Sequence, residues 1–101
     1  MLDVTQEYTP MGGIPGFVTG AQKLIFGHDS PLLRDGKVAS IQTIAGSGAL
    51  SMGFQFVKED IPSPVLVSDP TWANHEFIID HSGLGYRYYP YYDPIHKTVK
   101  I

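Results

Sequence analysis

The sequence has 101 residues, of which 43% are hydrophobic and 17% charged, so it suits one folded domain and is unlike a disordered chain. Its formal net charge of -3 gives no basic surface for nucleic acid, and no apolar run reaches the roughly 20 residues that span a bilayer. It contains no cysteine, which excludes disulfides and thiolate metal sites and fits a reducing compartment. We therefore expect a cytoplasmic protein with neither a nucleic-acid nor a membrane partner.

The first half of the chain predicts two helices separated by a strand. Ile14-Pro15 is a suitable helix start, because proline is tolerated in the first turn, and apolar residues then recur at helical spacing up to Gly27. The segment of residues 38–44 is short and rich in β-branched side chains, which predicts a strand. Residues 47–58 carry apolar side chains on one face, which predicts the second helix.

The second half predicts further strands and one more helix. Residues 65–67 form a short apolar run, which is typical of a strand buried on both faces. Asn74 is expected to cap a helix over residues 74–80. Residues 84–89 and 98–101 predict two more strands. This alternation predicts an α/β fold, with a mixed, mostly parallel sheet and covering helices.

A small-residue turn, Ala45-Gly46-Ser47-Gly48, follows the first predicted strand. Glycine lets the backbone approach a phosphate closely, and a helix N-terminus adds roughly half a positive charge. The turn is not a dinucleotide fingerprint, because Ser51 stands where the third glycine belongs, and no Gly-Lys-Ser/Thr of a P-loop follows. Two interpretations remain open: a phosphate cup, or a tight turn in which Ser47 only caps the helix.

Trp72, the only tryptophan, lies in a loop after the strand predicted at residues 65–67 and three residues before His75. One interpretation is a partly buried core side chain. However, ligand sites in α/β sheets gather at the carboxyl ends of strands, and both this loop and the Gly46 turn lie at such ends. This coincidence favours an aromatic plate beside a phosphate cup, which suits a flat phosphorylated cofactor. The four histidines show no metal-ligand spacing, so we predict no metal site.

Five segments in combination resemble the aspartate/aromatic aminotransferase family, whose cofactor is pyridoxal 5'-phosphate (PLP). They are residues 8–13, 26–27, 42–50, 68–75 and 91–93. The most specific feature is the small-residue loop followed by Pro-Thr-Trp-x-Asn-His, and the resemblance extends from Tyr8 to about Ile101. It implies a partial three-layer α/β/α sandwich over residues 1–101, an incomplete large domain of the PLP-transferase fold type I.

The resemblance implies a role for each matched position. Residues 45–47 would hold the cofactor phosphate through backbone N–H groups and the Ser47 hydroxyl. Trp72 would stack on the pyridine ring and lie against the substrate. His75 would stand behind the ring and support the carboxylate that pairs with the pyridinium nitrogen. Tyr8 would reach across a dimer interface to the phosphate of the partner subunit.

Other parts of the family's active site have no match here. PLP chemistry needs a lysine for the Schiff base and an acidic partner for the ring nitrogen, and the family also uses arginines to bind substrate. None of the lysines or arginines at positions 23, 34, 37, 58, 87, 97 and 100 matches these motifs. The resemblance therefore implies no catalytic residue within this chain, which is expected to be an internal piece of the family's large domain.

Two functions follow as expectations. In the first, the chain belongs to a homodimeric aminotransferase of the cytoplasm, or of mitochondria, that transfers an amino group between an amino acid, aspartate or aromatic, and a 2-oxo acid. In the second, it is a non-catalytic phosphate-binding or interaction module derived from the same fold.

Overall fold

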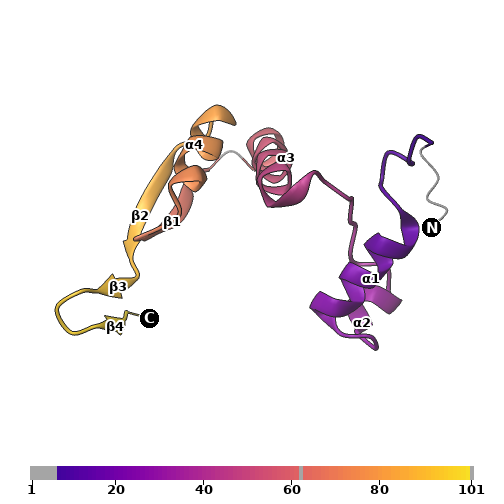
Figure 1. The fold of residues 1–101 in the computed structure, drawn as a ribbon, viewed down its shortest axis with the longest axis horizontal. Helices are drawn as coiled ribbons and strands as arrows, with labels where there is room; N and C mark the ends of the chain where they lie inside the picture. Colours follow the sequence, from indigo (N-terminus) through magenta and orange to yellow (C-terminus); the bar gives the residue numbers. More distant parts are fainter. Residues whose placement is uncertain (1–6, 62, 101) are drawn as a thin grey trace, which may run out of the picture. The chain divides into compact units, whose positions relative to one another are not determined.

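The computed structural model describes residues 7–61 and 63–100 (Figure 1). Backbone contacts divide the chain into two compact units, residues 1–43 and residues 44–101. The expectation of one partial domain over residues 1–101 stays a prediction. No helix in the described part is long and apolar enough to cross a membrane.

The N-terminal unit contains two helices, α1 (Pro15–Phe26) and α2 (Pro31–Arg34). The predicted start and end of α1 are confirmed: it begins at a proline, and the N–H of Gly27 donates to the carbonyl of Lys23 at 3.0 Å. The one-turn helix α2 was not predicted. It also begins at a proline, and it lies between the first predicted helix and residue 38, where no helix or strand was predicted.

Residues 38–44 form no strand, contrary to the prediction. They make isolated hydrogen bonds, among them one from the N–H of Gln42 to the carbonyl of Gly12 at 3.0 Å and one from the side-chain amide of Gln22 to the Ser40 hydroxyl at 2.9 Å. A strand requires a ladder of backbone pairs with a neighbour. Within the described residues this segment has no ladder partner, so β propensity alone does not produce a strand.

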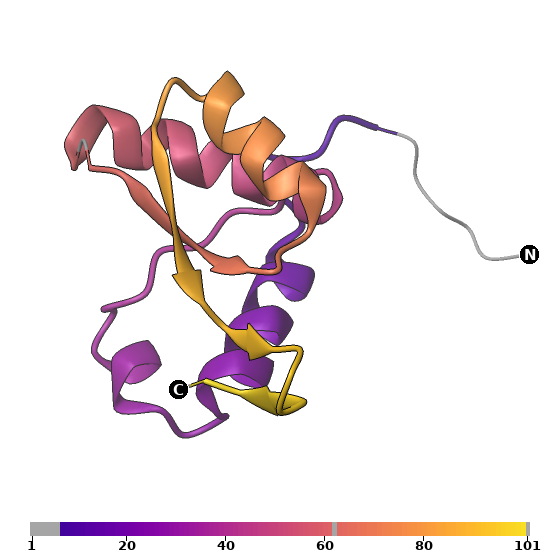
Figure 2. The same cartoon turned by 90° about the vertical axis from the view of Figure 1, so that its left-hand side faces the viewer.

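The C-terminal unit is an α/β structure, as predicted. Its helices are α3 (Ala45–Asp60) and α4 (Ala73–His81), and its strands β1 (Val65–Asp69) and β2 (Tyr86–Pro90) form a parallel pair. Helix α3 packs against α4, which also contacts β2, and Figures 1 and 2 show α4 beside the strand pair. The parallel pairing follows from the crossover through α4, which returns the chain to the same end of the sheet.

The small apolar core of this unit consists of Val67, Ile79 and Leu84, with Ile79 completely buried. Four partly buried side chains pack against it: Phe54, Val57, Val65 and Tyr86. The expectation that residues 65–67 are buried on both faces is wrong, because the side chain of Leu66 is 66% exposed. Successive strand residues point to opposite faces, and only the face that carries Val67 is covered in the described structure.

The boundaries of both helices differ from the prediction. Helix α3 begins at Ala45, two residues earlier than predicted, and ends two residues later. Helix α4 begins at Ala73, so Trp72 holds the N-cap position and Asn74 lies inside the first turn. Asn74 therefore does not cap the helix. The N–H of His75 donates instead to the backbone carbonyl of Trp72 at 2.9 Å.

The chain continues into a short hairpin of β3 (Tyr92–Asp93) and β4 (Thr98–Val99), which pair in antiparallel fashion. The carboxylate of Asp93 accepts hydrogen bonds from the backbone N–H groups of Ile95 and His96 at 2.9 and 3.2 Å, which fixes the turn. Strand β4 confirms the start of the strand predicted over residues 98–101, whose last residue lies outside the described part.

Candidate functional site

The N-terminus of α3 contains the residues of the predicted phosphate cup. Ala45, Gly46 and Ser47 are its first three residues, and all three are exposed. The first bond of the helix runs from the N–H of Gly48 to the carbonyl of Ile44 at 3.1 Å, so the N–H groups of Gly46 and Ser47 precede it. In a helix of 16 residues, this end carries the positive pole of the macrodipole. The arrangement can accept an anion.

The interpretation of Ser47 as an N-cap is wrong. Ile44 holds the N-cap position, with no side-chain cap bond, and Ser47 is the third helical residue. Ala45 has a φ of 52°, in the left-handed region that costs a non-glycine residue roughly 1 kcal/mol. Such strain concentrates at functional sites, and here it lies at the first residue of the predicted cup.

The start of α4 holds the predicted aromatic plate together with a fixed histidine. The ring of Trp72 is half exposed and meets the ring of His75 edge-on, with 5.3 Å between centroids. The Thr71 hydroxyl and Nδ1 of His75 share a hydrogen bond of 2.8 Å. Where the hydroxyl donates, Nδ1 is the acceptor and the ring proton lies on Nε2, which is then able to donate to another group.

A hollow of about 240 Å³ lies next to α3, α4 and the strand pair. Its lining comes from α3, β1, the following loop, α4 and β2: Leu50, Phe54, Val65, Leu66, Val67, Ser68, Thr71, His75, Ile79 and Tyr89. Leu50 lies one helical turn after Gly46 and Ser47, so the cup and the hollow share one side of α3. Of the predicted site residues, His75 lines this hollow beside Thr71, whereas residues 45–47 and Trp72 are not part of its lining.

Tyr8 belongs to the N-terminal unit, and its side chain is fully exposed. Its predicted role across a dimer interface stays a prediction. Thr71 is a contact that the sequence analysis did not assign to the site. Its signal is the spacing, because a threonine just before a helix lies four residues from His75, within reach of its ring.

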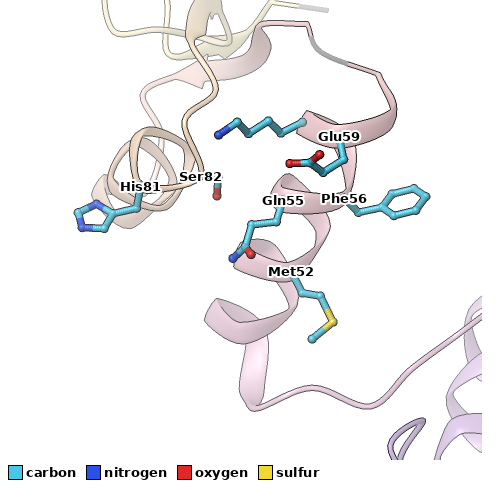
Figure 3. Close-up of a pocket in the computed structure, with 7 residues that line it drawn as sticks. Met52, Gln55, Phe56, Glu59, His81 and Ser82 are labelled. Carbon is cyan, nitrogen blue, oxygen red and sulfur yellow. The ribbon is translucent and has the colours of Figure 1, made fainter.

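A second hollow, of about 600 Å³, lies between the C-terminal halves of α3 and α4 (Figure 3). None of the predicted site residues lines it. Figure 3 shows Gln55 turned toward α4 and Phe56 pointing away from it. Its lining combines apolar, charged and neutral polar side chains: Met52, Gln55, Phe56, Lys58, Glu59, His81 and Ser82.

Two titratable groups outside the site have shifted pKa values. The Tyr88 hydroxyl donates to Oε1 of Glu76 at 2.6 Å, and this hydrogen bond to a carboxylate raises the pKa of Tyr88. The hydrogen bonds from His96 hold the pKa of Asp93 below its ordinary value. Within residues 7–61 and 63–100, no three His, Asp or Glu side chains gather as metal ligands would.

The comparison with known families identifies the same family as the sequence motifs. The model of the family "Aminotransferase class I and II" matches residues 3–101. The aromatic-amino-acid aminotransferase of Escherichia coli is 46% identical over 95 residues, which is 93% of this chain and 24% of that protein. Both cytoplasmic and mitochondrial aspartate aminotransferases are among the relatives.

Solved structures give the same result. The aspartate aminotransferase from the cytoplasm of Saccharomyces cerevisiae matches with a TM-score of 0.92 and 35% identity, over 99% of this chain and 24% of that one. An aromatic-amino-acid aminotransferase from Burkholderia pseudomallei, covalently bound to pyridoxal phosphate, matches with a TM-score of 0.85 and 38% identity, over 90% of this chain and 23% of that one. The chain spans about a quarter of the length of the relatives it matches.

Proposed function

Because this chain belongs to the family of class I and II aminotransferases, we propose that it forms part of a PLP-dependent enzyme that transfers an amino group between an amino acid and a 2-oxo acid. The observation that carries the proposal is the hollow in which one side of α3 meets Thr71 and His75. The start of α3 supplies a helix end that suits an anion, and the start of α4 supplies the half-exposed ring of Trp72 and the oriented His75, which are the features that a flat phosphorylated ring requires. When bound, PLP withdraws electrons from the substrate's reacting carbon.

In this proposal, the chain's residues bind and orient the cofactor. The backbone N–H groups of Ala45, Gly46 and Ser47, with the Ser47 hydroxyl, hold the phosphate. Trp72 stacks on the ring and lies against the substrate. His75, oriented by Thr71, donates from Nε2 to the carboxylate that pairs with the ring nitrogen.

The remaining parts of the enzyme come from elsewhere in the proposed assembly. Tyr8 contacts the phosphate bound to the partner subunit of a homodimer, and the Schiff-base lysine and substrate arginines lie outside residues 1–101. The substrate is an aspartate-like or aromatic amino acid, since both kinds of enzyme occur among the relatives. A cytoplasmic location accompanies the proposal, in keeping with the cytoplasmic relatives.

The test is the affinity for PLP of the full-length enzyme that carries these residues. Ser47→Ala is expected to weaken it by about 1–3 kcal/mol, which is roughly 5-fold to 150-fold, because a hydrogen bond to a charged phosphate is lost. Ser51→Ala is the matched control one turn further along α3, where the hydroxyl accepts from the side chain of Gln55. Equal PLP affinities of the wild type and Ser47→Ala would show that the Ser47 hydroxyl does not hold the phosphate.

A second assay separates this proposal from a phosphate-binding module without catalysis. The full-length enzyme should transfer amino groups to a 2-oxo acid, and residues 1–101 alone should not exceed the rate of free PLP, because the chain has no matched Schiff-base lysine. A binding module would instead take up PLP and inorganic phosphate without any transfer at full length.

A further inference from the structure

The segment that follows Tyr8 is a closed turn. The N–H of Gly13 donates to the carbonyl of Pro10 at 2.8 Å, which closes the turn two residues after Tyr8. Gly13 has a φ of 97°, a conformation that favours glycine. Because the side chain of Tyr8 is fully exposed, the direction in which its phenol points depends on the backbone that leads into this turn.

Gln42 holds the turn on both sides of Gly13. Its backbone N–H donates to the carbonyl of Gly12 at 3.0 Å, and its side-chain Oε1 accepts from the N–H of Ile14 at 2.8 Å. The side-chain bond joins residues 28 apart in the sequence, and the backbone bond to Gly12 spans two residues more. The turn is therefore fixed from a distant segment.

The contact is also close enough to exclude any side chain at residue 13. A Cβ built on Gly13 would overlap the Cβ of Gln42, and it would lie 2.8 Å from Oε1. The backbone at the turn thus packs directly on Gln42, and glycine is required there both by its φ and by this contact.

We propose that Gln42 is a positioning residue for Tyr8, which rests on the proposed role of Tyr8 at the phosphate of the partner subunit. Gln42 stands three residues before Ala45, the start of the cup, and it bonds the turn that follows Tyr8. The residue that holds the turn after Tyr8 thus lies close in sequence to the proposed cup. A turn held in place reduces the conformational entropy that Tyr8 loses when its hydroxyl binds.

A merely structural role for Gln42 is the alternative, and Gln22 supplies the matched control. Gln22 is in the same unit, and its side-chain amide likewise bonds a distant segment, at the Ser40 hydroxyl, but it does not contact the turn. Removing either glutamine costs a neutral hydrogen bond. Only the loss of Gln42 should change the affinity for PLP, because only Gln42 bonds the turn that follows Tyr8.

The experiment is a double-mutant cycle on the dissociation constant of PLP in the full-length enzyme, with thermal unfolding measured in parallel. Gln42→Leu should weaken PLP binding about threefold to tenfold, the scale of one hydrogen bond, whereas in a Tyr8→Phe background it should weaken binding by less than about twofold. Gln42→Glu keeps an acceptor for the N–H of Ile14 and should restore the affinity. Gln22→Leu should leave it unchanged.

Equal losses from Gln42→Leu in the two backgrounds, or no loss in either, would overturn the proposal. If Gln42→Leu does not fold, Gln42→Asn serves in its place, because its shorter side chain keeps the amide but does not reach Ile14. A wild type that binds no PLP contradicts the proposed function instead. A wild type that binds PLP and is weakened by Tyr8→Phe, but not by the Gln42 variants, contradicts only this inference.

Discussion

The two units of the chain are stabilised by different kinds of contact. In the N-terminal unit, no residue of α1 or α2 is buried, and Gln22 and Gln42 make hydrogen bonds to distant segments. In the C-terminal unit, Val67, Ile79 and Leu84 form an apolar core between a parallel strand pair and two helices. Burial of apolar area is the larger stabilising contribution in folding, whereas each hydrogen bond adds little net free energy.

This difference bears on how each unit contributes to the candidate site. The cup, Trp72 and His75 stand on elements that share the apolar core, so their geometry depends on packing. Tyr8 stands beside a turn whose geometry depends on glycine conformations and on Gln42. Changes to buried volume should therefore affect the C-terminal unit, and changes to backbone conformation should affect the N-terminal one.

The largest expected effect is that of Ile79→Ala. Ile79 is completely buried in the core, and truncating such a side chain costs about 2–5 kcal/mol. The fluorescence of Trp72, the only tryptophan, should report an earlier unfolding of this unit in urea. Leu66→Ala is the control, because Leu66 lies in the same unit but is 66% exposed. Equal losses in the two variants would mean that the core does not stabilise the unit.

In the N-terminal unit, two glycine substitutions should have opposite signs. Gly13→Ala should destabilise the unit by about 1–3 kcal/mol, because Gly13 has a φ of 97° and its new Cβ would overlap Gln42. Gly20→Ala should stabilise α1 by up to about 1 kcal/mol, because no atom lies near its added Cβ. Helical circular dichroism during thermal unfolding measures both effects. A shift of the same sign for both would show that backbone conformation does not control this unit.

The elements that were predicted correctly from the sequence are those defined by local chemistry. Pro15 and Gly27 mark the ends of α1, and Val65 marks the start of β1. The strand expected over residues 38–44 failed, because a strand depends on a partner that local composition does not specify. For the same reason, the exposure of Leu66 could not be read from its apolar neighbours.

The candidate site was predicted in its residue types more than in its contacts. The junction at residues 45–47 and the position of Trp72 beside a helix start follow from turn and helix patterns. The left-handed Ala45 could not be predicted, because alanine has no preference for that conformation. The bond of Thr71 to His75 depended on where α4 begins, which the prediction placed at Asn74.

A smaller effect is expected for Thr71→Val, which removes the hydroxyl that bonds His75. The C-terminal unit should lose about 0.5–1.5 kcal/mol, the net contribution of one hydrogen bond. The ring nitrogens of His75 should also change their tautomer balance, which ¹⁵N NMR shifts record. Thr19→Val, on the exposed surface of α1, is the control in the other unit. An unchanged His75 spectrum would show that Thr71 does not orient the ring.

The smallest expected effect is a local response of the β3–β4 hairpin to acid. Asp93 accepts hydrogen bonds from the ring of His96 and from the backbone N–H groups of His96 and Ile95, and Nζ of Lys100 lies 3.4 Å from its Oδ2. These contacts hold the pKa of Asp93 below 3.8 in the folded hairpin. Since the folded pKa is the lower one, the carboxylate stabilises the hairpin above about pH 4, and this contribution is lost as the pH falls below it.

Hydrogen exchange at the N–H of Lys100, which bonds the carbonyl of Tyr91 at 2.8 Å, measures the opening of the hairpin. Its protection relative to an unfolded reference peptide should fall as the pH is lowered below about 4, while the Trp72 transition reports the core separately. Asp93→Asn keeps an acceptor for the turn but removes the charge, so its protection should not change over that range. If the protection of Lys100 in Asp93→Asn still falls in acid, other carboxylates cause the hairpin to open. The contrast between an apolar core and a hairpin held by the charge of Asp93 would then be wrong.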